Sequence, residues 1–444
     1  MLSQFTSTYN DISSTIFTHA HNIPIHTNEL SQSDIVRLIV SIPSMPHSIS
    51  RQSDAVLEFL CNRRFHRRFA YIHENKRYRV SYADYGDPTS TSVVLFFGGL
   101  MGGRFSYSPL DQLAKHHGVR IIHPDRPGFG GSDPVALEER IETYMGMLPK
   151  LLSRLGIEHV SLAAHSFGTI YLLNTILLYP HLLHPSKPYV AFFAPWVHPR
   201  HTGIRHLQTA ELLPGGMINK FSSLAKFVNG TITPLSGMSS GLSSSVVTSL
   251  KTFIPQSVAP EVSMPLEPHA GGQRQSDRNR SSPDLNDAVV VQELRKLIPT
   301  FLFAETLHGA GQDAQLCLRK PRSVPWHTPA RPWEDVDNAV RLLEGLLSQD
   351  ERTGGQRVWQ IHAFHAETDS MVGEKGQVWF DACWMRDQNA NLDHQSVFKY
   401  DSQIVKGADH DFILDPVFGA SEAWLKRVSE AFAVRTVDVM SSEP

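Results

Sequence analysis

Residues 160–178 read VSLAAHSFGTIYLLNTILL. The run is almost wholly apolar, but His165, Ser166 and Gly168 interrupt it. This interruption argues against a membrane span and predicts a buried strand, a sharp turn and a buried helix. A strained turn of this kind needs small residues two positions before and after the serine, and Ala164 and Gly168 meet that need. The segment predicts an α/β fold that presents Ser166 as a candidate nucleophile.

Short apolar runs and helical patterns alternate on both sides of this segment. Before them, two alternating runs at 69–72 and 78–82 flank the polar turn 73–76 and predict a hairpin. Together the patterns predict a mostly parallel central sheet flanked by helices, which is the doubly wound α/β class. We expect strands at 93–97, 119–123, 160–164, 189–193, 358–364 and 397–405, and helices at 109–117, 141–155, 169–178, 376–386 and 420–434.

The alternation stops between Pro195 and Arg357, a length far beyond an ordinary connection. We therefore expect an inserted, mainly helical lid, in which the polar stretch 263–287 forms a disordered loop. Within this insertion, apolar residues recur with helical spacing at 204–228, 289–306 and 336–347. The expected division is an N-terminal helical extension at 1–66, the first part of the core at 67–196, the lid insertion at 197–356 and the second part of the core at 357–444.

The composition is that of an ordinary globular protein, with 41% hydrophobic and 19% charged residues and a net charge of −3. Such a charge favours a small-molecule substrate over nucleic acid as partner. Cys61, Cys317 and Cys383 have no short spacing, which favours a reducing compartment over a disulfide framework or a zinc site. Residues 1–22 lack a signal-peptide pattern, and 441–444 are not a peroxisomal signal. We expect a cytoplasmic protein with no stable membrane insertion.

Four more motifs follow the expected strands, and with the turn at Ser166 they resemble, in chain order, the α/β-hydrolase superfamily in its lipase, esterase and peptidase branch. The resemblance covers 69–196 and 358–434. Ala164 stands where the first glycine of the family's turn is commoner. The motifs are LFFGGLMGG at 95–103, PDRPGFGGSD at 124–133, HAETDSMV at 365–372 and GADHDF at 407–412.

The resemblance implies a catalytic triad of Ser166 as nucleophile, His410 as general base and Asp369 as the residue that orients the base. Serine is unreactive unless an adjacent imidazole takes its proton, and that imidazole needs a carboxylate to fix its tautomer. Glu367 lies on the same loop and competes for the acid role. The register of the following Met371 against the family pattern favours Asp369.

The resemblance also implies an oxyanion hole made by the backbone N–H groups of Leu100 and Phe167. Each donor would stabilise the tetrahedral intermediate by roughly 3 kcal/mol. Gly98 stands where the family usually has a histidine, and this departure leaves a backbone donor intact. In the next motif, Asp125 and Asp133 are expected to bond the loop rather than to act in catalysis.

Other residues have alternative interpretations. We expect His198 and His201, with His206 nearby, to be solvent-exposed at the start of the lid rather than to bind a metal. Several apolar residues fit equally well as the lining of an acyl pocket or as packing between lid and core. These are Trp196, Leu207, Leu212, Leu213, Met217, Ile218 and Phe221.

The expected reaction is hydrolysis of a carboxylic ester, or of a thioester, lactone or amide, through an acyl-enzyme. A large lid favours a bulky, apolar small molecule as substrate. We expect neither a metal nor an organic cofactor. Two alternatives stay open: an acyltransferase that uses the same triad, and a non-catalytic small-molecule receptor of the same fold.

Overall fold

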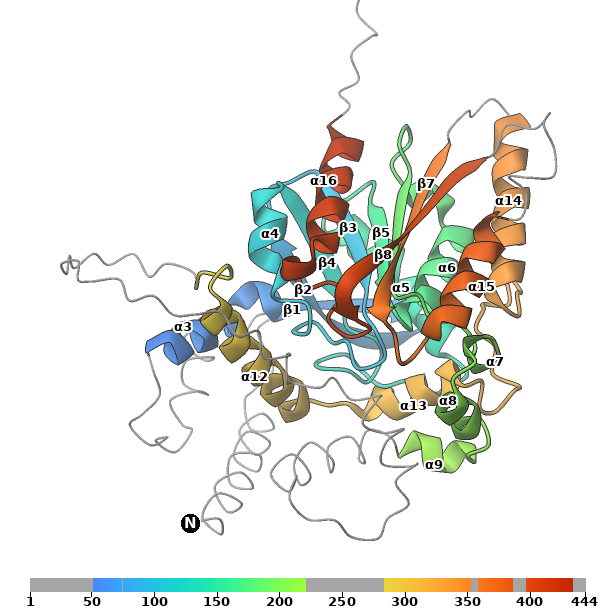
Figure 1. Cartoon of the computed structure of the whole chain (residues 1–444), viewed down its shortest axis with the longest axis horizontal. Coiled ribbons are helices and arrows are strands. Elements are labelled where there is room, and N and C mark those ends of the chain that lie inside the picture. Colours follow the sequence, from blue (N-terminus) through green and yellow to red (C-terminus); the bar gives the residue numbers. More distant parts are fainter. Residues whose placement is uncertain (1–50, 74, 221–282, 353–357, 386–396, 434–444) are drawn as a thin grey trace, which may run out of the picture.

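The computed structural model describes residues 51–73, 75–220, 283–352, 358–385 and 397–433. These residues form an eight-stranded sheet in the order β1-β2-β4-β3-β5-β6-β7-β8, with helices on both faces (Figure 1). The strands are β1 Arg67–His73, β2 Lys76–Gly86, β3 Ser92–Phe97, β4 Val119–Pro124, β5 Ser161–His165, β6 Tyr189–Phe193, β7 Trp359–Thr368 and β8 Phe398–Asp409.

The strand directions follow the expected pattern. The strands β1 and β2 form an antiparallel hairpin whose register ends at the pair His73 and Lys76, and β2 runs antiparallel to β4. All the other neighbouring pairs in this sheet are parallel. The predicted hairpin and the predicted mostly parallel sheet are therefore confirmed. The last two strands extend further than expected, to Thr368 and Asp409.

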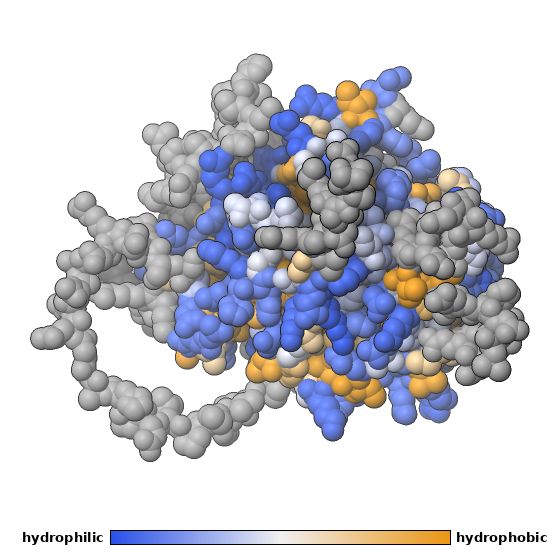
Figure 2. Space-filling view, turned by 90° about the horizontal axis from the view of Figure 1, so that it is seen from above, coloured by the Kyte–Doolittle hydropathy of each residue, from blue (hydrophilic) through white to orange (hydrophobic). Residues whose placement is uncertain are grey.

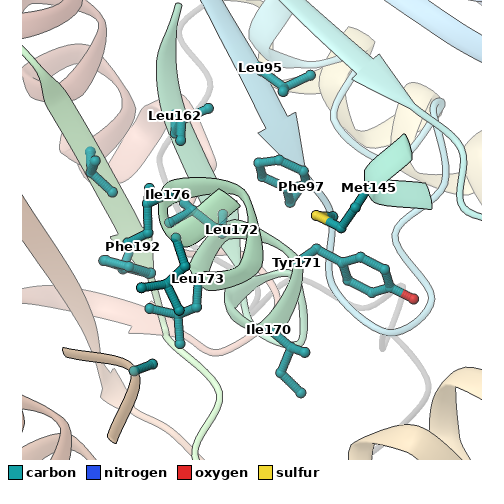
Figure 3. Packing of buried hydrophobic residues seen from close by; sticks show 14 of the residues in the cluster. Leu95, Phe97, Met145, Leu162, Ile170, Tyr171, Leu172, Leu173, Ile176 and Phe192 are labelled. Carbon is teal, nitrogen blue, oxygen red and sulfur yellow. The ribbon is translucent and has the colours of Figure 1, made fainter. Parts of the chain in front are cut away.

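Side chains of successive strand residues pack on opposite faces of the sheet, as strand geometry requires. In β3, Val93, Leu95 and Phe97 pack on one face, and Val94 and Phe96 on the other. Figure 3 shows Leu95 and Phe97 on the side of the sheet that carries α6, a helix that is mostly apolar and buried over its whole length except Leu178. The first face is covered by α5 Arg140–Arg154, α6 Gly168–Leu178, α14 Val336–Arg352 and α15 Gly373–Met385, and the second by α4 Leu110–His116 and α16 Ala420–Phe432.

The order of the strands reverses at β3, which lies between β4 and β5. The chain leaves β3 toward one edge of the sheet and later returns to its other side. Loops that follow the two strands at such a switch point diverge and leave a crevice, where parallel α/β sheets bind their ligands. The glycine-rich loop after β3 and the turn at Ser166 after β5 are the two loops concerned.

The segment after β6 contributes helices to two places. Helix α14 packs against α6 and α15, whereas α13 contacts α9, and α12 contacts α3 (Figure 1). In the described part of the stretch with helical spacing at 204–228, two short helices lie on either side of Pro214, which precedes the second one, and residues 221–228 lie outside the described residues. The remaining bounds are α3 Arg51–Leu60, α7 Pro199–Thr202, α8 Arg205–Ala210, α9 Gly215–Asn219, α12 Ala288–Ala304 and α13 His308–Cys317, with short 3₁₀ helices η1 Arg63–Phe65, η2 Pro180–Leu182 and η5 Pro416–Phe418.

Two expectations fall largely outside the described residues. They are the first part of the N-terminal extension, residues 1–50, and the loop 263–287 up to residue 282. The end of that loop is ordered, since Leu285 is buried and its N–H donates to Gln112 Oε1 at 2.7 Å. The division of the chain into extension, core and lid stays a proposal.

The surface seen in Figure 2, at the end of the molecule away from α9 and α13, is dominated by hydrophilic residues with separate apolar patches among them. Among the helices of the described ranges, none is both long enough and apolar enough to cross a bilayer.

Candidate active site

Ser166 occupies the sharp turn between β5 and α6. Its φ of 50° lies in the left-handed region, which non-glycine residues adopt rarely and at a cost in strain. Backbone hydrogen bonds hold the turn, because the Ser166 N–H donates to Phe193 O at 2.9 Å and its own carbonyl accepts from Trp196 N–H at 3.2 Å. Gly168 is required here, since a Cβ at that position would lie 2.2 Å from Phe97 O.

Ser166, His410 and Asp369 come together at the carboxyl ends of β5, β8 and β7. The Ser166 Oγ lies 2.7 Å from His410 Nε2, and His410 Nδ1 lies 2.9 Å from both carboxylate oxygens of Asp369. An ionised carboxylate only accepts hydrogen bonds, so Nδ1 carries the ring proton and Nε2 accepts from the serine hydroxyl. The three side chains form one continuous hydrogen-bonded chain.

Of the two carboxylates near the carboxyl end of β7, Glu367 in the strand and Asp369 after it, Asp369 is the one that contacts His410. The carboxylate of Glu367 instead accepts from the Gly407 N–H at 2.8 Å. Asp369 Oδ1 also accepts from the backbone N–H groups of Met371 and Val372, at 2.9 and 2.7 Å. These bonds fix the carboxylate in the direction of the imidazole.

The electrostatics of the pair favour a charged carboxylate beside an imidazole that protonates readily. Burial lowers the pKa of His410, but the charge of Asp369 and its hydrogen bonds outweigh burial and raise that pKa above its ordinary value. Burial raises the pKa of Asp369, but His410 and the two backbone N–H donors outweigh it and lower that pKa below its ordinary value. The imidazole is therefore a stronger base than a free histidine.

Two backbone N–H groups, one on the loop after β3 and one directly after Ser166, donate to no atom of the described residues. Gly99 is close enough that a Cβ there would lie 3.4 Å from Ser166 Cβ, so the loop after β3 borders the serine. Within the ranges that the structure describes, the N–H groups of Leu100 and Phe167 donate to no protein atom. Phe167 also caps the amino end of α6, where the helix dipole favours negative charge.

His165 and Tyr107 connect these loops, and neither was identified from the sequence. The Gly99 N–H donates to Tyr107 Oη at 2.7 Å, and that hydroxyl lies 2.9 Å from His165 Nδ1. His165 Nε2 lies 2.8 Å from His410 O, which can only accept, so His165 is neutral with its proton on Nε2. Burial and the nearby His410 lower the pKa of His165 to about 3. The only sequence signal was its position next to Ser166.

The two aspartates of the 124–133 loop bond the loop, as expected. Asp125 accepts from Ser81 Oγ at 2.6 Å and pairs with Arg104 at 2.7 Å. Asp133 pairs with Arg79 at 2.7 Å.

The expectation of exposed histidines at the start of the lid is wrong for two of them. His198 and His201 are half-buried, because each has a carboxylate partner: Glu211 at 3.2 Å for His198 and Asp335 at 3.0 Å for His201. His201 also stacks on Trp379, with ring centroids 3.6 Å apart. In the described part of the chain, no group of three or more His, Cys, Asp or Glu side chains is arranged to hold a metal.

The apolar residues expected either to line an acyl pocket or to pack the lid against the core include both buried and exposed side chains. Trp196, Leu207 and Ile218 are buried, and Leu213 packs partly against a buried cluster. Leu212 and Met217 are 81% and 60% exposed, so they neither pack the lid nor line a closed pocket. Phe221 lies outside the described residues.

Comparison with known proteins gives both sequence and structure matches. A family model described as the alpha/beta hydrolase family matches residues 94–422. No curated protein matches the sequence. Solved structures similar to this chain include a carboxylesterase of Nitrososphaera gargenis, at 13% identity and a TM-score of 0.44 over 82% of this chain and 99% of that one. A haloalkane dehalogenase from Bradyrhizobium elkani shows 15% identity and a TM-score of 0.42 over 82% and 99%. An epoxide hydrolase from Vigna radiata shows 15% identity and a TM-score of 0.43 over 83% and 98%. Because the family model spans most of the sequence, the chain belongs to the alpha/beta hydrolase family.

Proposed function

We propose that this chain is a serine hydrolase that cleaves carboxylic esters through an acyl-enzyme. The observation that carries the proposal is the hydrogen-bonded chain from Ser166 Oγ to His410 Nε2 at 2.7 Å, and from His410 Nδ1 to Asp369 at 2.9 Å. A serine with this partner is activated for attack on a carbonyl carbon, since the imidazole takes its proton as the new bond forms.

In the proposed reaction His410 moves one proton twice. It first accepts the hydroxyl proton while Ser166 Oγ bonds the carbonyl carbon, and it then donates that proton to the leaving alcohol. Water attacks the acyl-enzyme in the same manner, which releases the acid and restores the serine. Asp369 stays ionised throughout and stabilises the imidazolium, in keeping with its lowered pKa.

The unbonded N–H groups of Leu100 and Phe167 support a carbonyl substrate. Attack on a carbonyl places a negative charge on its oxygen. Two N–H donors that have no other acceptor among the described residues could bind that oxygen without breaking an existing hydrogen bond. The loss of one such donor costs about 3 kcal/mol in the transition state.

An apolar substrate is supported by the apolar contacts between the inserted helices and the loop after β3. Met101 on this loop is buried with Ile218 of α9, Leu302 of α12 and Ala314 of α13. Leu100 and other partly buried apolar residues pack against this cluster. The residue that supplies one proposed oxyanion donor thus packs against an apolar cluster, which suits an ester with a large apolar acyl or alcohol group.

The proposal is tested by hydrolysis of p-nitrophenyl esters of graded acyl length and by labelling with a fluorophosphonate. Wild-type protein is expected to turn over, to prefer longer acyl chains and to label at Ser166. Ser166→Ala is expected to neither turn over nor label. A folded wild-type protein that does neither would contradict the proposal, and acyl transfer to an added alcohol in preference to water would favour an acyltransferase.

A further inference from the structure

Arg126 binds three consecutive carbonyls of the loop after β3. Its Nη1 donates to Gly98 O at 2.6 Å, and its Nη2 donates to Gly99 O at 2.6 Å and to Leu100 O at 2.9 Å. The carbonyl of Gly99 and the N–H of Leu100 belong to the same peptide unit. Arg126 therefore holds one end of the peptide whose other end is the proposed oxyanion donor.

A peptide unit is planar, so the direction of its carbonyl fixes the direction of its N–H. A cation bonded to the carbonyl oxygen also polarises the unit and strengthens the N–H as a donor. The preceding peptide is occupied at both ends, since Gly98 O binds Arg126 and the Gly99 N–H binds Tyr107. In the described part of the chain, the Leu100 N–H has no acceptor, and the residue before it, Gly99, borders Ser166.

Arg126 contacts the second proposed donor residue as well. Its guanidinium carbon lies 5.6 Å from the centre of the Phe167 ring, within the range of a cation–π contact. One planar side chain thus touches both segments that supply the proposed oxyanion donors. Arginine suits this position because its rigid fork presents several donors at fixed angles, which a lysine ammonium does not.

The counter-charge for Arg126 comes from the inserted segment. Asp313 of α13 accepts from Arg126 Nε at 2.7 Å, and both side chains are buried. Its other oxygen accepts from Arg140 Nε at 2.9 Å. A buried cation without such a partner would be strongly unfavourable, so the position of α13 fixes the position of Arg126.

Helix α13 lies against the 124–133 loop by direct backbone contact. The Gly309 N–H donates to Gly128 O at 3.0 Å, and a Cβ on Gly309 would lie 2.2 Å from Pro127 O. Glycine on both sides permits this approach, which brings Asp313 to Arg126. The insertion is therefore joined to the catalytic loops by backbone and by charge.

We propose that Arg126 is a positioning residue that aims the Leu100 N–H at the oxyanion, and that Asp313 of the inserted helix holds Arg126 in place. This inference rests on the proposed serine hydrolase function. It assigns the inserted segment a part in transition-state stabilisation.

Arg126→Lys tests the proposal, because lysine keeps the charge but cannot bridge three carbonyls and a carboxylate. The kcat for p-nitrophenyl ester hydrolysis is expected to fall about 10²-fold, as for loss of an oxyanion donor, with KM changed less than about twofold. The affinity for a trifluoromethyl ketone, which forms an oxyanion with the serine, is expected to fall by the same factor. The pH at which kcat/KM falls on the acid side should not move, because His410 and Asp369 are untouched.

Arg140→Lys is the matched control. Arg140 is buried on the other side of Asp313 but donates to Pro127 O and to Gln312, not to the loop after β3. Its replacement is expected to lower Tm about as much as Arg126→Lys does, with kcat within about threefold of wild type. Equal losses of kcat in the two variants would overturn the proposal, because they would indicate a general packing effect.

Asp313→Asn decides the question if Arg126→Lys does not fold, since it keeps the shape of the side chain and leaves Arg126 present. A folded Asp313→Asn variant is expected to lose about tenfold in kcat at unchanged KM. A folded Arg126→Lys or Asp313→Asn variant with wild-type kcat would overturn the positioning role of Arg126 and leave the proposed serine hydrolase function standing. A wild type that neither labels nor turns over would remove the proposed function, and the inference with it.

Discussion

Asp369→Asn preserves the shape of the proposed triad and changes its charge. In the wild type both oxygens of Asp369 lie 2.9 Å from His410 Nδ1, so the ring proton is on Nδ1 and a lone pair faces Ser166. An asparagine amide turned toward the ring would donate a hydrogen to Nδ1. The ring proton would then move to Nε2, where it faces the serine, and His410 could no longer act as the base.

The expected loss follows from the distance between the charges. Two unit charges 2.9 Å apart interact by about 6 kcal/mol at an effective dielectric constant of about 20. At about 1.4 kcal/mol for each factor of ten, the imidazolium that forms in the transition state loses stabilisation worth about four powers of ten. The same figure of about 10⁴ is expected for a triad whose histidine adopts the wrong tautomer.

The assay is kcat for p-nitrophenyl ester hydrolysis, with the fluorophosphonate labelling rate beside it. Glu367→Gln is the matched control, because Glu367 is the other carboxylate near the end of β7 and binds the Gly407 N–H instead of His410. Glu367→Gln is expected to retain wild-type kcat within about twofold. The reasoning is refuted if Asp369→Asn folds and keeps kcat within about tenfold of the wild type, or if Glu367→Gln is the more damaged variant.

Three further measurements follow from the geometry. The raised pKa of His410 places the acid-side fall of kcat/KM above pH 6.5, the ordinary pKa of histidine, because the protonated imidazole cannot accept the serine proton. In Asp369→Asn burial still lowers the pKa of His410 but the charge of Asp369 no longer raises it, so this fall should move to lower pH. A fall that does not move would contradict the pairing of Asp369 with His410. Gly168→Ala would place a Cβ 2.2 Å from Phe97 O and should lower the free energy of unfolding in urea by about 1–3 kcal/mol. Gly345→Ala is its control: the new Cβ meets nothing within 4 Å, and the change inside a helix should raise the free energy of unfolding by up to about 1 kcal/mol. Tyr107→Phe removes the acceptor of the buried Gly99 N–H and should lower stability by about 1–3 kcal/mol, together with a fall in kcat. Unchanged Tm and kcat would show that the hydrogen bond between Gly99 and Tyr107 does not support the loop after β3.

Much of the fold is encoded in local sequence patterns. The alternating and continuous apolar runs predicted the hairpin and the parallel strands, because strand periodicity and burial act over a few neighbouring residues. The turn at Ser166 was predictable for the same reason, since Ala164 and Gly168 lie within two positions of it. The helical spacing at 204–228 indicated the type of structure but not its division into two short helices, because Pro214 stands directly before the second one.

The arrangement of the candidate site depended on contacts that no local pattern contains. Glu367 and Asp369 are chemically alike and two positions apart, and only the packing of β7 beside β8 places one of them against His410. The sequence by itself determined the order of the motifs along the chain and the residue types needed for the chemistry. Only the tertiary structure joined Arg126 to Asp313 across 187 positions of the chain, because the pairing of two buried charges depends on where an inserted helix lies against the sheet's loops rather than on the residues beside either one.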